Sequence, residues 1–81
     1  MSIEDQVRKY ILENYLFTDD QSELANETSL LEQGVIDSTG IMELVFFLEE
    51  EFGIKVNDDE MVPENLDSVT SIVSFVNSKI S

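Results

Sequence analysis

The sequence predicts an all-α protein built as a small four-helix bundle. Apolar residues recur in several stretches at the 3.6-residue spacing of an amphipathic helix. No segment shows the sustained alternation of apolar and polar residues that marks a half-buried strand. The 81 residues suffice for one small core. We therefore expect residues 1–81 to form a single domain, with three longer helices, a short third helix, and a long loop between the first two.

The first helix is expected to extend from Ser2 to about residue 16. Ser2 is a favoured N-cap residue, and Glu4 and Asp5 suit the positive end of the helix dipole. The apolar stripe of this helix consists of Ile3, Val7, Tyr10, Ile11 and Tyr15. This pattern predicts an amphipathic helix that packs on the core.

Residues 17–35 form the long connection to the second helix. Asp19, Asp20, Asn26 and Gly34 are turn-forming residues within it. Leu30 and Leu31 are expected to anchor the loop to the core. A connection of this length without a clear helix is typical of a functional loop, or of one that apolar residues hold in place.

The central helix is expected to begin at Ser38. Asp37 is a favoured N-cap residue, and Ile36 and Ile41 have the spacing of a hydrophobic staple around it. Residues of one face then recur at helical spacing. This stripe consists of Ile41, Leu44, Val45, Leu48 and Phe52. Gly53 follows as the residue expected to end the helix in a left-handed conformation.

Ser38 therefore occupies the first position of the central helix, where a side chain is exposed. Backbone N–H groups of the first helical turn have no partner within the helix, and the helix dipole is positive there. A phosphate attached to this serine would be stabilised by roughly 0.3–1 kcal/mol. Seen alone, however, Ser38 could be an ordinary polar residue at a helix start.

The outer face of the same helix combines apolar and acidic residues. Met42 lies at the edge of the core stripe and Phe46 well outside it, so both are expected to be partly exposed. The residues expected to form a docking surface for a partner protein are Thr39, Met42, Glu43, Phe46, Glu49 and Glu50. The alternative is that Met42 and Phe46 are scattered surface apolar residues, which are normal on soluble proteins.

The last third of the chain predicts two more helices. Asn57 is expected to cap a short third helix through Met61, which Pro63 would stop at or before Val62. Asp67 or Ser68 is expected to cap the fourth helix. The stripe of the fourth helix consists of Val69, Ile72, Val73, Val76 and Ile80, with Lys79 near the negative end of its dipole.

The charge of the chain indicates the kind of partner. It has 18 acidic residues against four basic ones, for a formal net charge of −14, and no basic residue lies between Lys9 and Lys55. Nucleic acids and anionic membranes need clustered lysine and arginine, so we expect neither as a partner. Basic proteins are the natural partners, although acidity can also serve solubility alone. We expect a monomer.

Several kinds of chemistry are not expected of the chain itself because it contains neither cysteine nor histidine. No disulfide or protein thiol is available, and serine with carboxylates alone does not make a familiar nucleophile and base pair. The acidic run Asp58-Asp59-Glu60 lacks the ligand spacing of a calcium loop, so no metal site is expected. Nothing resembles a signal peptide or a membrane span, and cytoplasmic residence is the expectation.

Three motifs together resemble the acyl carrier protein family. They are Asp37-Ser38 at a helix start, the helix segment Glu43-Leu44-Val45 continued by residues 48–54, and the later segment 66–69 that opens the last helix. The resemblance covers nearly the whole chain and implies the four-helix bundle of acyl-carrier type. It implies that Ser38 carries 4′-phosphopantetheine, transferred from coenzyme A by a phosphopantetheinyl transferase of the holo-ACP synthase type. It also implies that Asp37 helps to present this serine and that the protein has no catalysis of its own.

The residues after Ser38 depart from the pattern of fatty-acid carriers. Thr39 and Gly40 stand where many of those proteins have leucine and an acidic residue, so a larger apolar contact and a charge are missing. Gly40 also lowers helix propensity by about 1 kcal/mol relative to alanine. We therefore expect a specialised stand-alone bacterial carrier.

Its cargo is expected to be an acyl intermediate of fatty-acid, polyketide or other specialised synthesis, held as a thioester. The partners would be basic-surfaced enzymes that transfer acyl or aminoacyl groups. Two alternatives stay open, an aminoacyl or peptidyl carrier with the same attachment chemistry and an unmodified acidic interaction domain.

Overall fold

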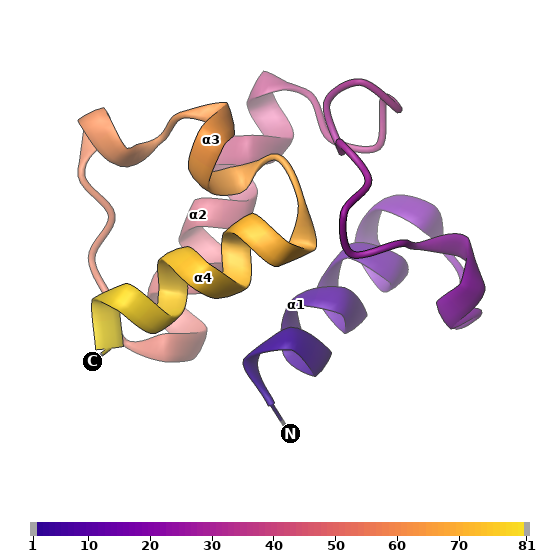
Figure 1. The fold of residues 1–81 in the computed structure, drawn as a ribbon, viewed down its shortest axis with the longest axis horizontal. Helices are drawn as coiled ribbons and strands as arrows, with labels where there is room; N and C mark the ends of the chain where they lie inside the picture. Colours follow the sequence, from indigo (N-terminus) through magenta and orange to yellow (C-terminus); the bar gives the residue numbers. More distant parts are fainter. Residues whose placement is uncertain (1, 81) are drawn as a thin grey trace.

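The computed structural model describes residues 2–80, and this part of the chain folds into helices and connecting loops without a strand. The longer helices are α1 (Ile3–Ile11), α2 (Ser38–Phe52) and α4 (Val69–Ile80), and the short α3 spans Pro63–Leu66. In Figure 1, α4 lies in front of α2, with α1 on one side and α3 close to its start. The all-α fold and the predicted number of α-helices are confirmed.

One apolar core joins all four helices and the long loop. Its buried side chains, which among the described residues include no polar or charged group, are Val7, Ile11, Leu12, Leu24, Leu30, Ile36, Leu44, Val45, Leu48, Val56, Leu66, Val69, Ile72, Phe75 and Val76. Because every helix contributes residues of one face, none of them can bury its stripe alone. The core therefore fixes the helices relative to one another.

The first helical segment is longer than one regular α-helix. Ser2 caps it as expected, since its hydroxyl oxygen accepts a hydrogen bond from the Asp5 N–H at 3.1 Å. The α-helix ends at Ile11 and continues as a π-helical turn over Leu12–Leu16. The expected end near residue 16 is thus right for the segment, but its last turn is wider than an α-helical turn.

The long loop between α1 and α2 is held at both ends by side chains outside it. The Arg8 guanidinium donates to the Gln21 and Asn26 side chains, at 2.9 Å and 2.5 Å. At the other end, the Asp67 carboxylate accepts hydrogen bonds from the Ser29 hydroxyl at 2.6 Å and the Leu31 N–H at 2.9 Å. Leu30 is buried, while Leu31 is only half-buried. The loop is thus ordered by polar contacts as well as by its leucines.

The third helix lies later in the sequence than expected. Asn57 and Glu60 do form a capping box, but the turn that they cap is a 3-10 turn over Asp58–Glu60. Pro63 then occupies the first turn of α3. Proline is well suited to a first helical position because its missing N–H would have no helical partner there. The preceding turn does end before Pro63, as predicted. The sequence did not predict that Pro63 also begins the next helix.

The last helix differs from its predicted stripe at its end. Phe75 is buried, whereas Ile80, which the stripe placed on the core, is 51% exposed. The reason is visible in Figure 1, where the final turn of α4 lies at the edge of the molecule. In residues 2–80, no helix has the length and apolar character needed to cross a membrane.

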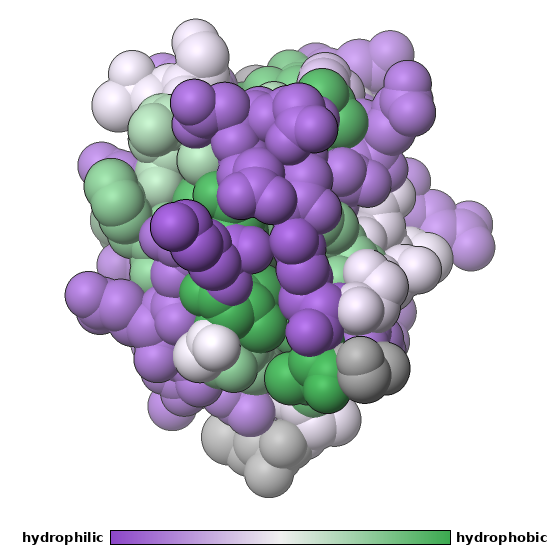
Figure 2. Space-filling model, turned by 90° about the vertical axis from the view of Figure 1, so that its left-hand side faces the viewer, coloured by the Kyte–Doolittle hydropathy of each residue, from purple (hydrophilic) through white to green (hydrophobic). Residues whose placement is uncertain are grey.

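One side of the molecule shows mainly hydrophilic groups (Figure 2). Figure 2 shows the side of the molecule that faces left in Figure 1, where apolar groups emerge only between polar ones. The large apolar side chains that are exposed among the described residues are Phe17, Met42, Phe46 and Ile80. Two of them, Met42 and Phe46, lie on the outer face of α2, as the sequence predicts.

Candidate functional site

Ser38 is the first residue of α2 and is exposed. The Asp37 carboxylate caps the helix by accepting a hydrogen bond from the Gly40 N–H at 2.8 Å. Within residues 2–80, neither the Ser38 hydroxyl nor the backbone N–H groups of Ser38 and Thr39 have a hydrogen-bond partner. The helix start therefore presents a hydroxyl group and two free N–H donors to solvent, as expected.

A surface hollow of about 260 Å³ lies beside Ser38. Its lining consists of Leu31, Ser38, Ile41, Met42, Met61, Val62 and Pro63. Ser38 is the only one of these residues with a polar side chain, so the hollow can hold an apolar or weakly polar chain but offers no cation to an anion. An anion on Ser38 would rely on the helix start itself.

The hollow could be predicted only in part from the sequence. The helical spacing places Ser38, Ile41 and Met42 on adjoining positions of α2. The other side of the hollow comes from Leu31 in the long loop and from residues 61–63, which precede and open α3. No local pattern in the sequence indicates that these two segments meet at Ser38.

Gly40 is closely packed in the first turn of α2. It is buried, and a Cβ atom at this position would lie 2.9 Å from Cγ2 of Ile36 and 3.3 Å from Cε1 of Tyr15. The first of these distances is shorter than carbon atoms tolerate, and Ile36 is itself buried. The sequence showed only the low helix propensity of Gly40, whereas the structure shows that close packing requires a glycine here.

Tyr15 is a site residue that the sequence placed only in a core stripe. Its hydroxyl donates to Glu43 Oε2 at 3.0 Å and lies 3.3 Å from the Gly40 carbonyl oxygen. Burial, followed by the neighbouring Tyr10 and Glu43, raises the pKa of Tyr15 far above its usual value. The hydroxyl therefore keeps its proton and remains a donor at neutral pH.

The six residues expected to dock a partner have different environments. Thr39, Met42, Glu43, Phe46 and Glu50 are exposed, with Met42 at 46% and Phe46 at 61%. Glu49 is half-buried, and its carboxylate accepts a hydrogen bond from the Val56 N–H at 2.9 Å. Glu49 thus ties the end of α2 to the following segment. The docking surface itself stays a prediction.

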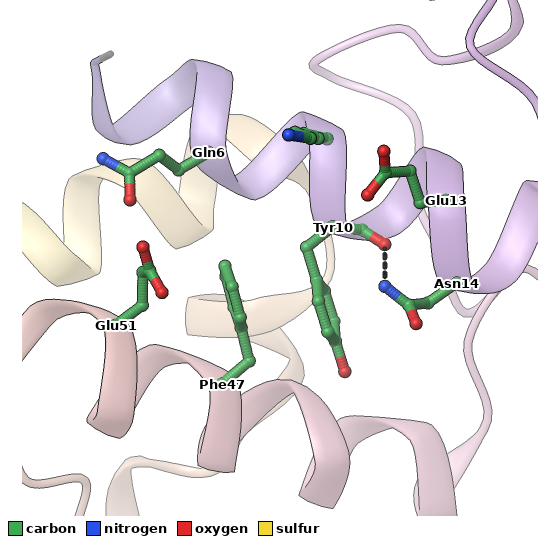
Figure 3. A pocket seen from close by; sticks show the side chains of 7 residues that line it. Gln6, Tyr10, Glu13, Asn14, Phe47 and Glu51 are labelled. Carbon is green, nitrogen blue, oxygen red and sulfur yellow. Dashed lines mark hydrogen bonds between the residues drawn. The ribbon is translucent and has the colours of Figure 1, made fainter.

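A second hollow, of about 250 Å³, lies between α1 and α2 and is shown in Figure 3. The rings of Tyr10 and Phe47 stack there, with centroids 4.1 Å apart and an angle of 12° between their planes. Asn14 donates from its side chain to the Tyr10 carbonyl oxygen at 2.9 Å. Ser38 is not among the residues that line this hollow, so it is separate from the candidate site. Phe47 serves here as a contact between two helices.

Comparison with known proteins agrees with this geometry. Residues 7–76 match the family model of the phosphopantetheine attachment site. The chain is 42% identical over 76 residues to the D-alanyl carrier protein of Streptococcus pyogenes serotype M5 (strain Manfredo), a match that covers 94% of this chain and 92% of the relative. The D-alanyl carrier proteins of serotype M49 (strain NZ131) and of serotype M1 match to the same extent.

Proposed function

Because this chain belongs to the phosphopantetheine-attachment family, we propose that it is an aminoacyl carrier protein that holds its cargo through Ser38. Members of this family carry 4′-phosphopantetheine through a covalent bond. The observation that carries the proposal is the free, exposed Ser38 hydroxyl at the start of α2, next to two unpaired backbone N–H groups.

The residues around Ser38 fit the group. When attached, the group supplies a terminal thiol that can hold a cargo as a thioester, and the chain has no cysteine of its own. The free N–H groups of Ser38 and Thr39 suit the phosphate, because they are donors at the positive end of a helix. The apolar hollow beside Ser38 suits the pantetheine arm, which extends from the phosphate of this group.

The protein's own share of the chemistry is recognition and positioning. Asp37 fixes where the helix begins, and with it the direction in which the Ser38 side chain leaves the surface. Among the described residues no base contacts the Ser38 hydroxyl, so the partner enzyme must remove its proton during attachment. A carrier in this sense presents a group to other enzymes and raises its effective concentration by tethering.

The relatives favour an amino acid over a fatty acid as the cargo. All those named above are D-alanyl carriers, which supports an aminoacyl cargo better than the fatty-acid or polyketide cargo expected from the sequence. The departures at Thr39 and Gly40 from the fatty-acid pattern agree with this choice. We propose a small amino acid of the D-alanine type.

The first experiment measures the intact mass of the purified chain. It is incubated with coenzyme A, Mg²⁺ and a broad-specificity phosphopantetheinyl transferase, beside Ser38→Ala and Ser68→Ala. Ser68 is a matched control because it also follows an aspartate at a helix start, yet its hydroxyl is engaged with Ser71 at 3.0 Å. We expect one phosphopantetheine increment in the wild-type chain and in Ser68→Ala, and none in Ser38→Ala.

A second step tests the cargo. The loaded protein is incubated with ATP, a ligase that charges D-alanyl carrier proteins, and either D-alanine or a fatty acid. An alanyl increment that hydroxylamine removes is expected with D-alanine. If Ser38 cannot be loaded under conditions that modify a control carrier, the carrier proposal is wrong, and an unmodified acidic interaction domain becomes the better interpretation.

A further inference from the structure

The π-helical turn after α1 and the beginning of α2 meet at a joint made by Tyr15, Gly40 and Glu43. Tyr15 belongs to the π-helical turn that ends the first helical segment, a kind of turn often found at functional positions. Its hydroxyl reaches Glu43 Oε2 at 3.0 Å and the Gly40 carbonyl oxygen at 3.3 Å. One side chain from the π-helical turn thus contacts two residues of the first turns of α2.

The joint is closely packed as well as hydrogen-bonded. There is no room for a Cβ atom at Gly40 between Ile36 and the Tyr15 ring. A helix start that lies this close to its neighbour cannot shift without a clash or without losing the contacts of the Tyr15 hydroxyl. Gly40 is two residues from Ser38, in the same helical turn. Any displacement at the joint would therefore move Ser38.

We propose that Tyr15 is a positioning residue, which holds the first turn of α2, and hence Ser38, in the orientation that the modifying enzyme requires. Glu43 takes part as a hydrogen-bond acceptor for Tyr15, not as a docking charge. This inference rests on the proposed function of Ser38. It assigns a role to Tyr15 and changes the one expected for Glu43.

The protonation of Tyr15 agrees with this role. Burial and its two polar neighbours keep the phenol protonated, so that the donor is present throughout the neutral range. Glu43 is exposed, and its carboxylate accepts a hydrogen bond from the Tyr15 hydroxyl. A glutamine at position 43 would still offer an amide oxygen to Tyr15 while removing the charge. This difference separates the two roles of Glu43.

The experiment measures kcat and KM for attachment of phosphopantetheine to Ser38 by a purified transferase. The variants are Tyr15→Phe, Glu43→Ala, Glu43→Gln and the double variant Tyr15→Phe/Glu43→Ala. Glu51→Gln is the matched control, because it removes an exposed charge from the same helix without touching the joint or the predicted docking surface. Urea unfolding of every variant confirms that the protein is folded under the assay conditions.

We expect Tyr15→Phe to lower kcat/KM by about threefold to tenfold, the range that one net hydrogen bond can account for. Glu43→Ala should lower it equally, and the double variant should be no worse than either single one. Glu43→Gln and Glu51→Gln should resemble the wild type. Wild-type rates for Tyr15→Phe would overturn the proposal. So would equal losses in Glu43→Gln and Glu43→Ala, which would identify Glu43 as a docking charge.

A spectroscopic readout keeps the two proposals apart. Backbone amide shifts of Ser38 and Thr39 are compared in the same variants, since they report the orientation of the helix start and do not need a transferase. We expect Tyr15→Phe and Glu43→Ala to move both signals in the same way and Glu43→Gln to leave them unchanged. If the wild-type protein is never loaded, the proposed function fails. If the signals stay unchanged in Tyr15→Phe, the positioning role fails.

Discussion

Replacing Gly40 with alanine sets two effects of similar size against each other. In a helix, alanine is more favourable than glycine by about 1 kcal/mol, so propensity alone predicts a more stable protein. The added Cβ, however, would lie 2.9 Å from Cγ2 of the buried Ile36 and 3.3 Å from the Tyr15 ring. Overpacking of this kind costs about 1–3 kcal/mol. We therefore expect Gly40→Ala to be less stable by roughly 1 kcal/mol.

The sign of this change is readily measured. For a domain of this size, 1 kcal/mol lowers Tm by about 4–8 °C, and urea unfolding followed by circular dichroism gives the free energy directly. Thr39→Ala is the matched control, because Thr39 is the preceding residue of the same turn and is exposed. That variant should be as stable as the wild type or slightly more so. If Gly40→Ala is also stabilised, the Cβ is accommodated and the argument for a close-packed joint is wrong.

Three further changes test other parts of the structure. Asp37→Ala should lower the free energy of unfolding by about 1 kcal/mol, because the Gly40 N–H loses its cap, whereas Asp37→Asn should lower it little, as urea unfolding of both variants will show. The pKa of Glu60 is lowered from 4.5, mainly by its hydrogen bond with Lys79 and next by its hydrogen bond with the Asn57 N–H. The folded state therefore favours the charged form of Glu60, and this stabilisation is present above about pH 4.5. As the pH falls through the lowered pKa, the difference in Tm between the wild type and Glu60→Gln should therefore vanish, and a difference that does not shrink as the pH falls would contradict the assignment. Finally, because the net charge is −14, Tm should rise with added NaCl or MgCl₂, and a flat titration would show that self-repulsion is unimportant.

The parts of the fold that depend on neighbouring residues could be predicted from the sequence. Ser2 and Asp37 cap their helices with their own side chains, and Gly53 ends α2 with a φ of 64°. These are local events, since a cap involves groups only a few residues apart. The place of Ser38 at the start of α2 followed from Asp37 in the same way. The element that carries the candidate site was thus predictable with its boundaries.

The parts that depend on distant residues could not be predicted in this way. The confinement of Gly40 comes from the nearby Ile36 and from Tyr15, and Tyr15 is 25 positions earlier in the chain. Leu31 and Pro63 reach the hollow beside Ser38 because of how the loop and α3 are packed. Helical spacing records which face a residue occupies, but it does not record what lies opposite. For this reason the sequence predicted the position of Ser38 but not the distant residues that surround it.

The sequence Asp-Ser occurs at two helix starts, and the contacts of each aspartate explain why only one of the serines is free. At the start of α2, Asp37 caps the helix and the Ser38 hydroxyl has no partner among the described residues. Before α4, the Asp67 carboxylate is already bonded to the loop through Ser29 and Leu31, so Ser68 becomes the cap and accepts a hydrogen bond from the Ser71 N–H at 3.1 Å. The aspartate of the pair therefore caps α2, whereas the serine of the pair caps α4. Ser29→Ala would leave the Asp67 carboxylate bonded to the Leu31 N–H, so Ser68 should remain the cap. Ser68 is also half-buried, unlike Ser38.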